Sequence, residues 1–212
     1  MLRPPARRVV TDLPLLRFTL DDGRAVGLRP LRSTDRARLA EGFERLSELS
    51  RRLRFIGPMS HLSEDQLDYL TTVDGQDHVA WGALDLSDSQ QAGLGVARFI
   101  RLPDDPEIAE VSFVVLDAVQ GLGLGRLLLA VLCATAPSVG VATLRAVVGS
   151  ENERASTWLQ RLGAVVVARG TETVFDLPVA SPSAPSAPSS SAFYALVDEV
   201  RPLVTRYVQN EA

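Results

Sequence analysis

The chain has 212 residues, of which 46% are hydrophobic and 23% charged, and its formal net charge at pH 7 is -4. This length and apolar content suit one globular domain with a full core and a tail, and the negative charge disfavours nucleic acid or an anionic membrane as a partner. Because no apolar run approaches the roughly 20 residues that span a bilayer and the N-terminus lacks a signal-peptide pattern, we expect a cytoplasmic protein.

Cysteine and histidine are rare, with one and two copies respectively. These numbers exclude an internal disulfide and disfavour a metal cluster, so we expect no metal. Cys133 lies in a leucine-rich segment and is predicted to be a small buried hydrophobe and not a nucleophile.

The first half of the chain predicts a β-meander with two helices inserted near its start. Asp22 and Gly23 form the turn of a hairpin. Ser33 is a plausible N-cap of the first helix, and Ser63 with Gln66 forms the capping box of the second. The predicted elements are a flexible arm at 1–12, strands at 16–20 and 24–29, helices at about 34–46 and 64–71, and strands at 79–84 and 93–102.

The second half predicts a central strand, a glycine-rich turn and a long helix, followed by smaller elements. Asn152 is a good N-cap and Gly163 a good C-cap for the helix between them. The predicted elements are strands at 110–116 and 142–148, helices from 126 and from 152 to 162, and a closing hairpin at 164–169 and 171–177. The domain then occupies residues 13–178.

The C-terminal region has two parts. Residues 179–191 are rich in serine, proline and alanine and predict a linker. Residues 192–212 carry apolar side chains at helical spacing and predict an amphipathic helix. Isolated short helices are marginal in water, so docking on the domain is favoured over a partner-binding role for Phe193 to Tyr207.

The turn after the central strand carries Gly121, Gly123 and Gly125. A glycine loop that ends at a helix start leaves backbone N–H groups free, in the positive end of the helix dipole, and suits a phosphate group. The dinucleotide fingerprint fits poorly, since it requires G-x-G-x-x-G after a first strand and an acidic residue about 20 positions later. Arg145 occupies that later position.

The sequence Gln120-Gly-Leu-Gly-Leu-Gly125 instead fits the pattern Gln/Arg-x-x-Gly-x-Gly/Ala. A second motif follows at Asn152, with Ala155, Arg161 and Gly163 in matching positions. Together they resemble the GNAT superfamily of acyl-CoA-dependent N-acetyltransferases. The segments 46–55, 62–67 and 73–80 are similar to the catalytic domain of bacterial protein-lysine acetyltransferases.

This resemblance implies an α/β (α+β) fold with a central mixed, mostly antiparallel sheet flanked by helices, and acetyl-CoA as the acyl donor. It also implies two groups of donor-binding residues. Phe113, Val114 and Val115 would pair with the pantetheine arm, and a backbone N–H near Val115 would face the thioester oxygen. The diphosphate would be wrapped by Gln120, Gly121, Leu122, Gly123, Leu124, Gly125 and Arg126. Asn152 either contacts the donor or only caps its helix.

Glu110 is the candidate catalytic residue. A protonated amine cannot attack a carbonyl, so a base is needed beside the acceptor. Glu110 shares a strand face with Ser112 and Val114, and the family often places a glutamate on this strand. The competing interpretation is a solvated strand end paired with an arginine. Leu159 stands where the family often has a tyrosine that protonates the leaving thiolate.

Two further polar groups remain open. Asp74, Asp77 and His78 precede a strand, and such loop clusters are more often structural than catalytic; His78 is expected to titrate near neutrality. The arginines at positions 51, 52 and 54 most simply form a solvated helix face, with binding of an acidic substrate or of the 3′-phosphate of the donor as the alternative.

Three functions follow from these residues. The first is acetyl transfer to a protein lysine, the second is acetyl transfer to a small amine, and the third is a non-catalytic module that senses acyl-CoA or binds a partner.

Overall fold

The computed structural model describes residues 15–55, 59–180 and 188–211. Within these ranges the chain forms one eight-stranded sheet in the order β1-β2-β3-β4-β5-β6-β8-β7. Neighbouring strands run antiparallel apart from the parallel pair β5 and β6. The strands are β1 (Leu16–Thr19), β2 (Ala25–Pro30), β3 (His78–Asp85), β4 (Gly93–Leu102), β5 (Asp105–Val115), β6 (Thr143–Gly149), β7 (Val165–Arg169) and β8 (Glu172–Pro178).

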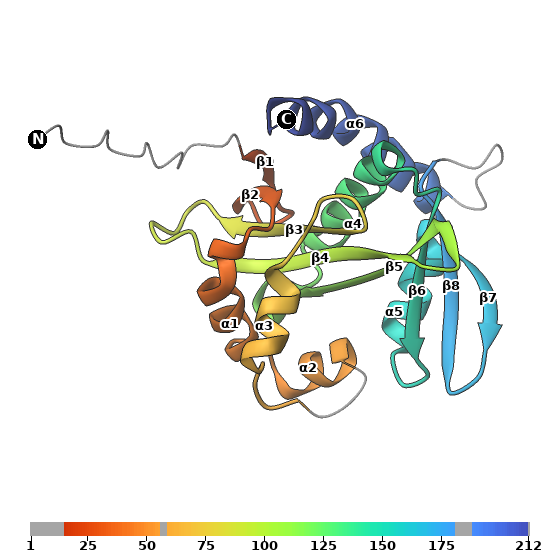
Figure 1. Cartoon of the computed structure of the whole chain (residues 1–212), viewed down its shortest axis with the longest axis horizontal. Helices are drawn as coiled ribbons and strands as arrows, with labels where there is room; N and C mark the ends of the chain where they lie inside the picture. Colours follow the sequence, from red (N-terminus) through yellow and green to blue (C-terminus); the bar gives the residue numbers. More distant parts are fainter. Residues whose placement is uncertain (1–14, 56–58, 181–187, 212) are drawn as a thin grey trace, which may run out of the picture.

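Helices cover both faces of this sheet (Figure 1). The helices are α1 (Arg36–Glu44), α2 (Glu48–Phe55), α3 (Glu64–Thr71), α4 (Leu124–Thr135), α5 (Glu153–Leu162) and α6 (Pro188–Glu211), with short 3-10 turns at Ser33–Asp35, Asp117–Val119 and Ala136–Val139. The first three helices lie on one face, where α1 contacts β4 and α2 contacts β5. On the other face, α4 packs against β3, β4 and β5.

The central strand β5 divides its side chains between these two layers. Ala109, Val111 and Val115 are buried in the core with α4. Glu110, Ser112 and Val114 alternate with them and therefore face the side of α1 and α2. The predicted alternation is thus observed, and it turns Glu110 away from the core.

Helix α4 is apolar on all sides because the sheet covers one side and α6 covers the other. Cys133 lies there with 0% exposure, and burial raises the pKa of its thiol to about 12. The prediction of a small buried hydrophobe is confirmed.

The C-terminal helix differs from its prediction in extent. Helix α6 begins at Pro188 instead of residue 192, and its apolar side joins the domain core, so the domain is not complete at residue 178. Phe193 and Val197 are fully buried, and the Tyr194 hydroxyl donates to the Pro178 carbonyl at 2.8 Å. The predicted docking is confirmed, and the covered face is not available to a partner.

Some predicted regions fall outside this description. The arm at 1–12 lies outside the described residues, as does most of the linker at 179–191. Among the helices that the structure describes, none is both long and apolar enough to cross a membrane.

Candidate active site

The sheet opens beside its central strand. Strands β5 and β6 are bridged only from Ile108 to Glu110, although β5 continues to Val115 and β6 to Gly149. The N–H of Leu116 donates to Leu94 on the β4 side at 2.9 Å. Because backbone groups alternate in direction along a strand, those of Val115 and Phe113 face the opening. Those of Val114 face β4, and its side chain lines a cavity on the α1 face.

The glycine loop closes the end of this opening and starts α4. Gly121 and Gly123 have φ angles of +81° and +88°, which other residues adopt only with strain. Gly123 is the N-cap of α4, so the first N–H groups of that helix have no intrahelical acceptor. Arg126 is exposed in the first turn. The loop therefore offers unpaired donors and positive charge to an anion.

Gln120 bridges three elements around the opening. Its side-chain amide donates to the Ser50 hydroxyl of α2 at 3.2 Å and to the Val115 carbonyl at 3.1 Å, and it accepts from Arg154 of α5 at 3.3 Å. Arg154 was not predicted from the sequence. It brings a second positive charge close to the loop.

Helix α5 lies beside the same opening. The ring of its Trp158 is 5.2 Å from that of Phe113 between centroids. Asn152 accepts a hydrogen bond from the Ala155 N–H at 3.1 Å, which is the capping geometry that the sequence predicted. Leu159 is 1% exposed and packs in the core, so this position presents no acid to the opening.

Glu110 lies where the paired part of β5 and β6 ends. Its register partner on β6 is Arg145. The Arg145 guanidinium forms a bidentate ion pair with the Asp176 carboxylate at 2.8 Å and not with Glu110. Glu110 is exposed, and within the described residues it has no cation within 4 Å. The competing interpretation, a strand end neutralised by an arginine, therefore loses its most obvious partner.

Helix α2 is fixed against this region by Asp117, a contact that no local sequence pattern predicts. The Asp117 carboxylate accepts from the Ser47 N–H and from the hydroxyls of Ser47 and Ser50, at 2.8 to 2.9 Å. Burial raises the pKa of this carboxyl, but these hydrogen bonds outweigh burial and lower it. The contact places the C-terminal end of α2 over the cavity beside Glu110.

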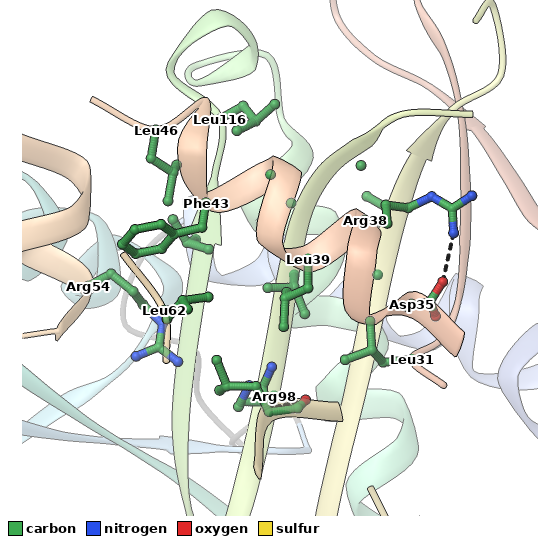
Figure 2. A pocket seen from close by; sticks show the side chains of 18 of the residues that line it. Leu31, Asp35, Arg38, Leu39, Phe43, Leu46, Arg54, Leu62, Arg98 and Leu116 are labelled. Atoms are coloured by element: carbon green, nitrogen blue, oxygen red, sulfur yellow. Dashed lines mark hydrogen bonds and ion pairs between the residues drawn. The ribbon is translucent and has the colours of Figure 1, made fainter. Parts of the chain in front are cut away.

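That cavity has a volume of about 370 Å³ and lies between α2, α3 and the strands β4 and β5. Glu110, Ser112, Ile100 and Tyr69 line it together with two arginines, Arg54 and Arg98. A smaller apolar cavity beneath α1 adjoins it and shares both arginines (Figure 2). Figure 2 shows that Arg54 and Arg98 lie away from the ion pair of Asp35 and Arg38, which is at the other end of the smaller cavity.

The polar cluster before β3 is structural in part. Asp74 accepts three backbone N–H bonds from residues 76 to 78 and so holds the turn. His78 is buried, and its Nε2 lies 2.9 Å from Nη1 of Arg98. Burial and the charge of Arg98 lower the pKa of His78 below its ordinary value.

Arg51, Arg52 and Arg54 do not share one environment. Arg52 is exposed, as predicted for a solvated face. Arg51 lies over the Phe43 ring at 4.7 Å and donates to the carbonyls of Glu44 and Ser60. Arg54 lines the cavity and so does not belong to the predicted solvated face.

A matched pair of glycine substitutions tests the loop. Gly121 and Gly140 have φ angles of +81° and +79°, and a Cβ on either meets no atom of the described residues within 4 Å. Valine at either site costs about 1–3 kcal/mol of backbone strain. We expect only Gly121→Val to weaken acetyl-CoA binding, by about 10-fold, because relaxing that strain moves the loop N–H groups. Calorimetry measures both; equal affinities would contradict this role for the loop.

An open sheet, an unpaired strand edge and a glycine loop at a helix start are the features of α/β domains that bind an extended phosphorylated ligand. The family described as acetyltransferase (GNAT) domain matches residues 25–165. The chain belongs to the GNAT acetyltransferase family. The resemblance inferred from the glycine loop and the Asn152 motif is confirmed.

Two curated relatives share this region. Acetyltransferase PA5475 of Pseudomonas aeruginosa is 36% identical over 111 residues, which cover 52% of this chain and 59% of that protein. Acetyltransferase Pat of Mycolicibacterium smegmatis is 38% identical over 105 residues, which cover 48% of this chain and 30% of that protein. The chain thus matches less than two thirds of the length of either relative.

Solved structures agree on the fold. The GNAT domain of S. lividans PAT is 25% identical, with a TM-score of 0.71 over 77% of this chain and 96% of that one. The cAMP-binding acyltransferase from Mycobacterium smegmatis is 27% identical, with a TM-score of 0.56 over 90% of this chain and 55% of that one. YncA from Salmonella typhimurium, a putative acetyltransferase with acetyl-CoA, is 20% identical with a TM-score of 0.59 over 76% and 98% of the two chains, and shows the fold alone.

Proposed function

We propose that this chain transfers the acetyl group of acetyl-CoA to a primary amine, with a protein lysine as the acceptor and Glu110 as the general base. The observation that carries the proposal is the position of Glu110. It is exposed, without an ion pair in the described part of the chain, at the point where β5 and β6 separate and beside a cavity of about 370 Å³.

The donor site is proposed from the free backbone edge and the loop. Acetyl-CoA, when bound, supplies an activated thioester carbonyl. The edge groups of Phe113 and the N–H of Val115 pair with an extended arm, and the N–H groups from 121 to 126, next to the Gln120 side chain, bind a diphosphate. A GNAT-fold structure that carries acetyl-CoA supports this donor.

Proton transfer falls to Glu110. A lysine amine with a pKa of about 10.4 is protonated at neutral pH and has no lone pair for attack. Glu110 accepts that proton directly or through one water. The thiol of coenzyme A has a pKa of about 8.5, so it leaves as a thiolate. No general acid is therefore needed at position 159, where this chain has leucine.

The shape of the cavity favours an amine at the end of a flexible side chain. Tyr69 and Glu110 are exposed at its mouth, so a lysine side chain reaches the base while its backbone stays outside. Similarity to Acetyltransferase Pat and to the S. lividans PAT domain supports acetyl transfer as the reaction. A volume of about 370 Å³ also admits a whole small amine, which is the second candidate.

Coenzyme A release tests both candidates. The chain itself contains no lysine, so it adds no self-acetylation on lysine side chains to the signal. We expect release with acetyl-CoA and a lysine-rich protein, and no release once the lysines of that protein are succinylated. Release only with small amines selects the second candidate. Saturable acetyl-CoA binding without release on any amine would contradict both and indicate a binding module.

A further inference from the structure

Arg54 and Arg98 line the cavity beside Glu110, and within the described residues they lack the carboxylate partners that comparable arginines have. Elsewhere, arginines with little exposed side chain pair with carboxylates, namely Arg29 with Asp35, Arg51 with Glu44 and Arg101 with Asp77. Arg98 is only 2% exposed, and among the described residues its Nε has no hydrogen-bond partner. A buried guanidinium donor without an acceptor is costly, and Arg98 also has no carboxylate partner among the described residues, so an anion bound beside it would stabilise it.

The partners that Arg98 does have are neutral. Its Nη1 lies 2.9 Å from the Leu70 carbonyl and 2.9 Å from Nε2 of His78. A guanidinium only donates, so Nε2 of His78 accepts and carries no proton. These two contacts hold Arg98 in place and leave its charge uncompensated.

Arg54 adds a second unpaired charge at the same place. In the ranges that the structure describes, no carboxylate lies within 4 Å of it, and its guanidinium packs 4.8 Å from the Phe55 ring. Burial lowers the pKa of Arg54, although Glu110 and Tyr69 act in the opposite direction. Burial and the nearby Arg54 lower the pKa of Arg98 to about 10, which still leaves it protonated at pH 7.

A purely structural role explains only part of this arrangement. Arg98 joins α3 to β3 through Leu70 and His78, but that role uses Nη1 and leaves Nε idle. It gives no reason for a second arginine from α2 on the same cavity. Two like charges at low dielectric repel each other unless an anion lies between them.

We propose that the acceptor carries a carboxylate close to its reactive amine and that Arg54 and Arg98 bind this carboxylate. The proposal rests on acetyl transfer to an amine at Glu110 and adds the chemical class of the acceptor. Arg98 lies opposite Ser112 in the strand register, and Glu110 lies two residues before Ser112 on β5. The carboxylate of Glu110 thus receives the ammonium group of the acceptor. Arg54 and Arg98 receive the carboxylate of the same acceptor. The carboxylate belongs to an acidic side chain beside a target lysine or to the α-carboxylate of a free amino acid.

A binding experiment examines the anion site without any chemistry. Glutarate, which has carboxylates and no amine, is titrated into the full chain by calorimetry, with glutaramide as the neutral probe. We expect glutarate alone to bind, and Arg54→Gln to weaken it about 10- to 100-fold, the range of a hydrogen bond to a charged group. Arg52→Gln removes an equal charge from the exposed side of the same helix and serves as the control.

A kinetic experiment then identifies the source of the carboxylate. One arm compares a lysine peptide flanked by glutamates with the same peptide flanked by glutamines, and the other compares free lysine with lysine amide. We expect wild type to favour the acidic member of at least one pair by 10-fold or more in kcat/KM. That ratio should fall towards one in Arg54→Gln and persist in Arg52→Gln. If Arg54→Gln unfolds, Arg54→Lys keeps the charge without the planar fork and should give a smaller loss.

The outcomes distinguish the proposed carboxylate site from the proposed acetyl transfer at Glu110. No glutarate binding, or equal binding by Arg54→Gln, overturns the anion site even if acetyl transfer occurs. Equal kcat/KM for both members of both pairs overturns it as well. Glutarate binding that depends on Arg54, without coenzyme A release on any amine, retains the anion site and removes the proposed catalysis.

Discussion

Glu110→Gln is expected to lower kcat by about 100-fold or more while acetyl-CoA affinity stays near that of the wild type. Glutamine keeps the size and hydrogen-bonding reach of the side chain but does not accept a proton. The loss should be largest at neutral pH, where a lysine with a pKa of about 10.4 is almost fully protonated. As the pH rises towards that value the amine loses its proton to solvent, and the deficit should shrink.

Steady-state coenzyme A release between pH 7 and 10 measures this effect, and calorimetry measures donor affinity. Glu107→Gln is the matched control, because Glu107 is an exposed carboxylate on the same strand. An unchanged kcat in Glu110→Gln removes the base role. A loss that is independent of pH would instead indicate that Glu110 positions the acceptor.

The elements that the sequence predicts well are those set by local chemistry. Ser63 and Gln66 exchange the hydrogen bonds of a capping box at the start of α3. Asn152 caps α5, and Gly163 ends it with a φ of +100°. Each depends on residues within one helical turn, so a single sequence suffices. The glycine loop belongs to the same group, since strand, turn and helix are consecutive.

The missed features join residues that are far apart in the chain. Asp117 anchors α2 through Ser47 and Ser50, and no local pattern predicts that contact. In the sequence, Arg54 does not differ from the other arginines of a polar helix. Only the tertiary structure places it in a cavity between the sheet and α3. Arg98 did leave a signal, because it is a charged residue inside the apolar segment from Leu94 to Ile100. A charged residue within an apolar strand, such as Glu110 on β5 or Arg98 on β4, is therefore a signal that the sequence alone provides.

Helix α6 shows why the domain boundary was placed too early. The linker composition is real, but composition does not reveal that α4 is apolar on the side away from the sheet. That side needs a cover, and Phe193 and Val197 supply it. A helix that is hydrophobic on all sides must be covered on the side away from the sheet. The sequence of α4 therefore predicts a further packing element.

Asp35→Asn is expected to lower the free energy of unfolding by about 3 kcal/mol at pH 7, as when one partner of a buried ion pair is removed. The Asp35 side chain is 3% exposed, pairs with Arg29 through both oxygens at 2.6 and 2.7 Å, and also pairs with Arg38 at 2.8 Å. Burial raises the pKa of Asp35, but the hydrogen bonds and charge of Arg29 outweigh burial and lower it.

The pH dependence follows from the sign of that shift. The unfolded carboxyl has a pKa of about 3.9, and the folded value is lower, so the stabilisation by Asp35 is present above pH 4. It is lost as pH falls through the folded pKa, where wild type becomes protonated and resembles the asparagine variant. Urea unfolding of both proteins between pH 3 and 7 should therefore show a difference that shrinks with acid.

An exposed pair provides the matched control for this experiment. Asp198 is 72% exposed and lies 3.8 Å from Arg201 on the same helix. Asp198→Asn should change the unfolding free energy by less than about 1 kcal/mol at every pH, because solvent screens the pair. If Asp35→Asn behaves like Asp198→Asn, the buried network does not hold α1 on the sheet. The apolar contacts of Leu39 and Phe43 beneath α1 then carry that attachment alone.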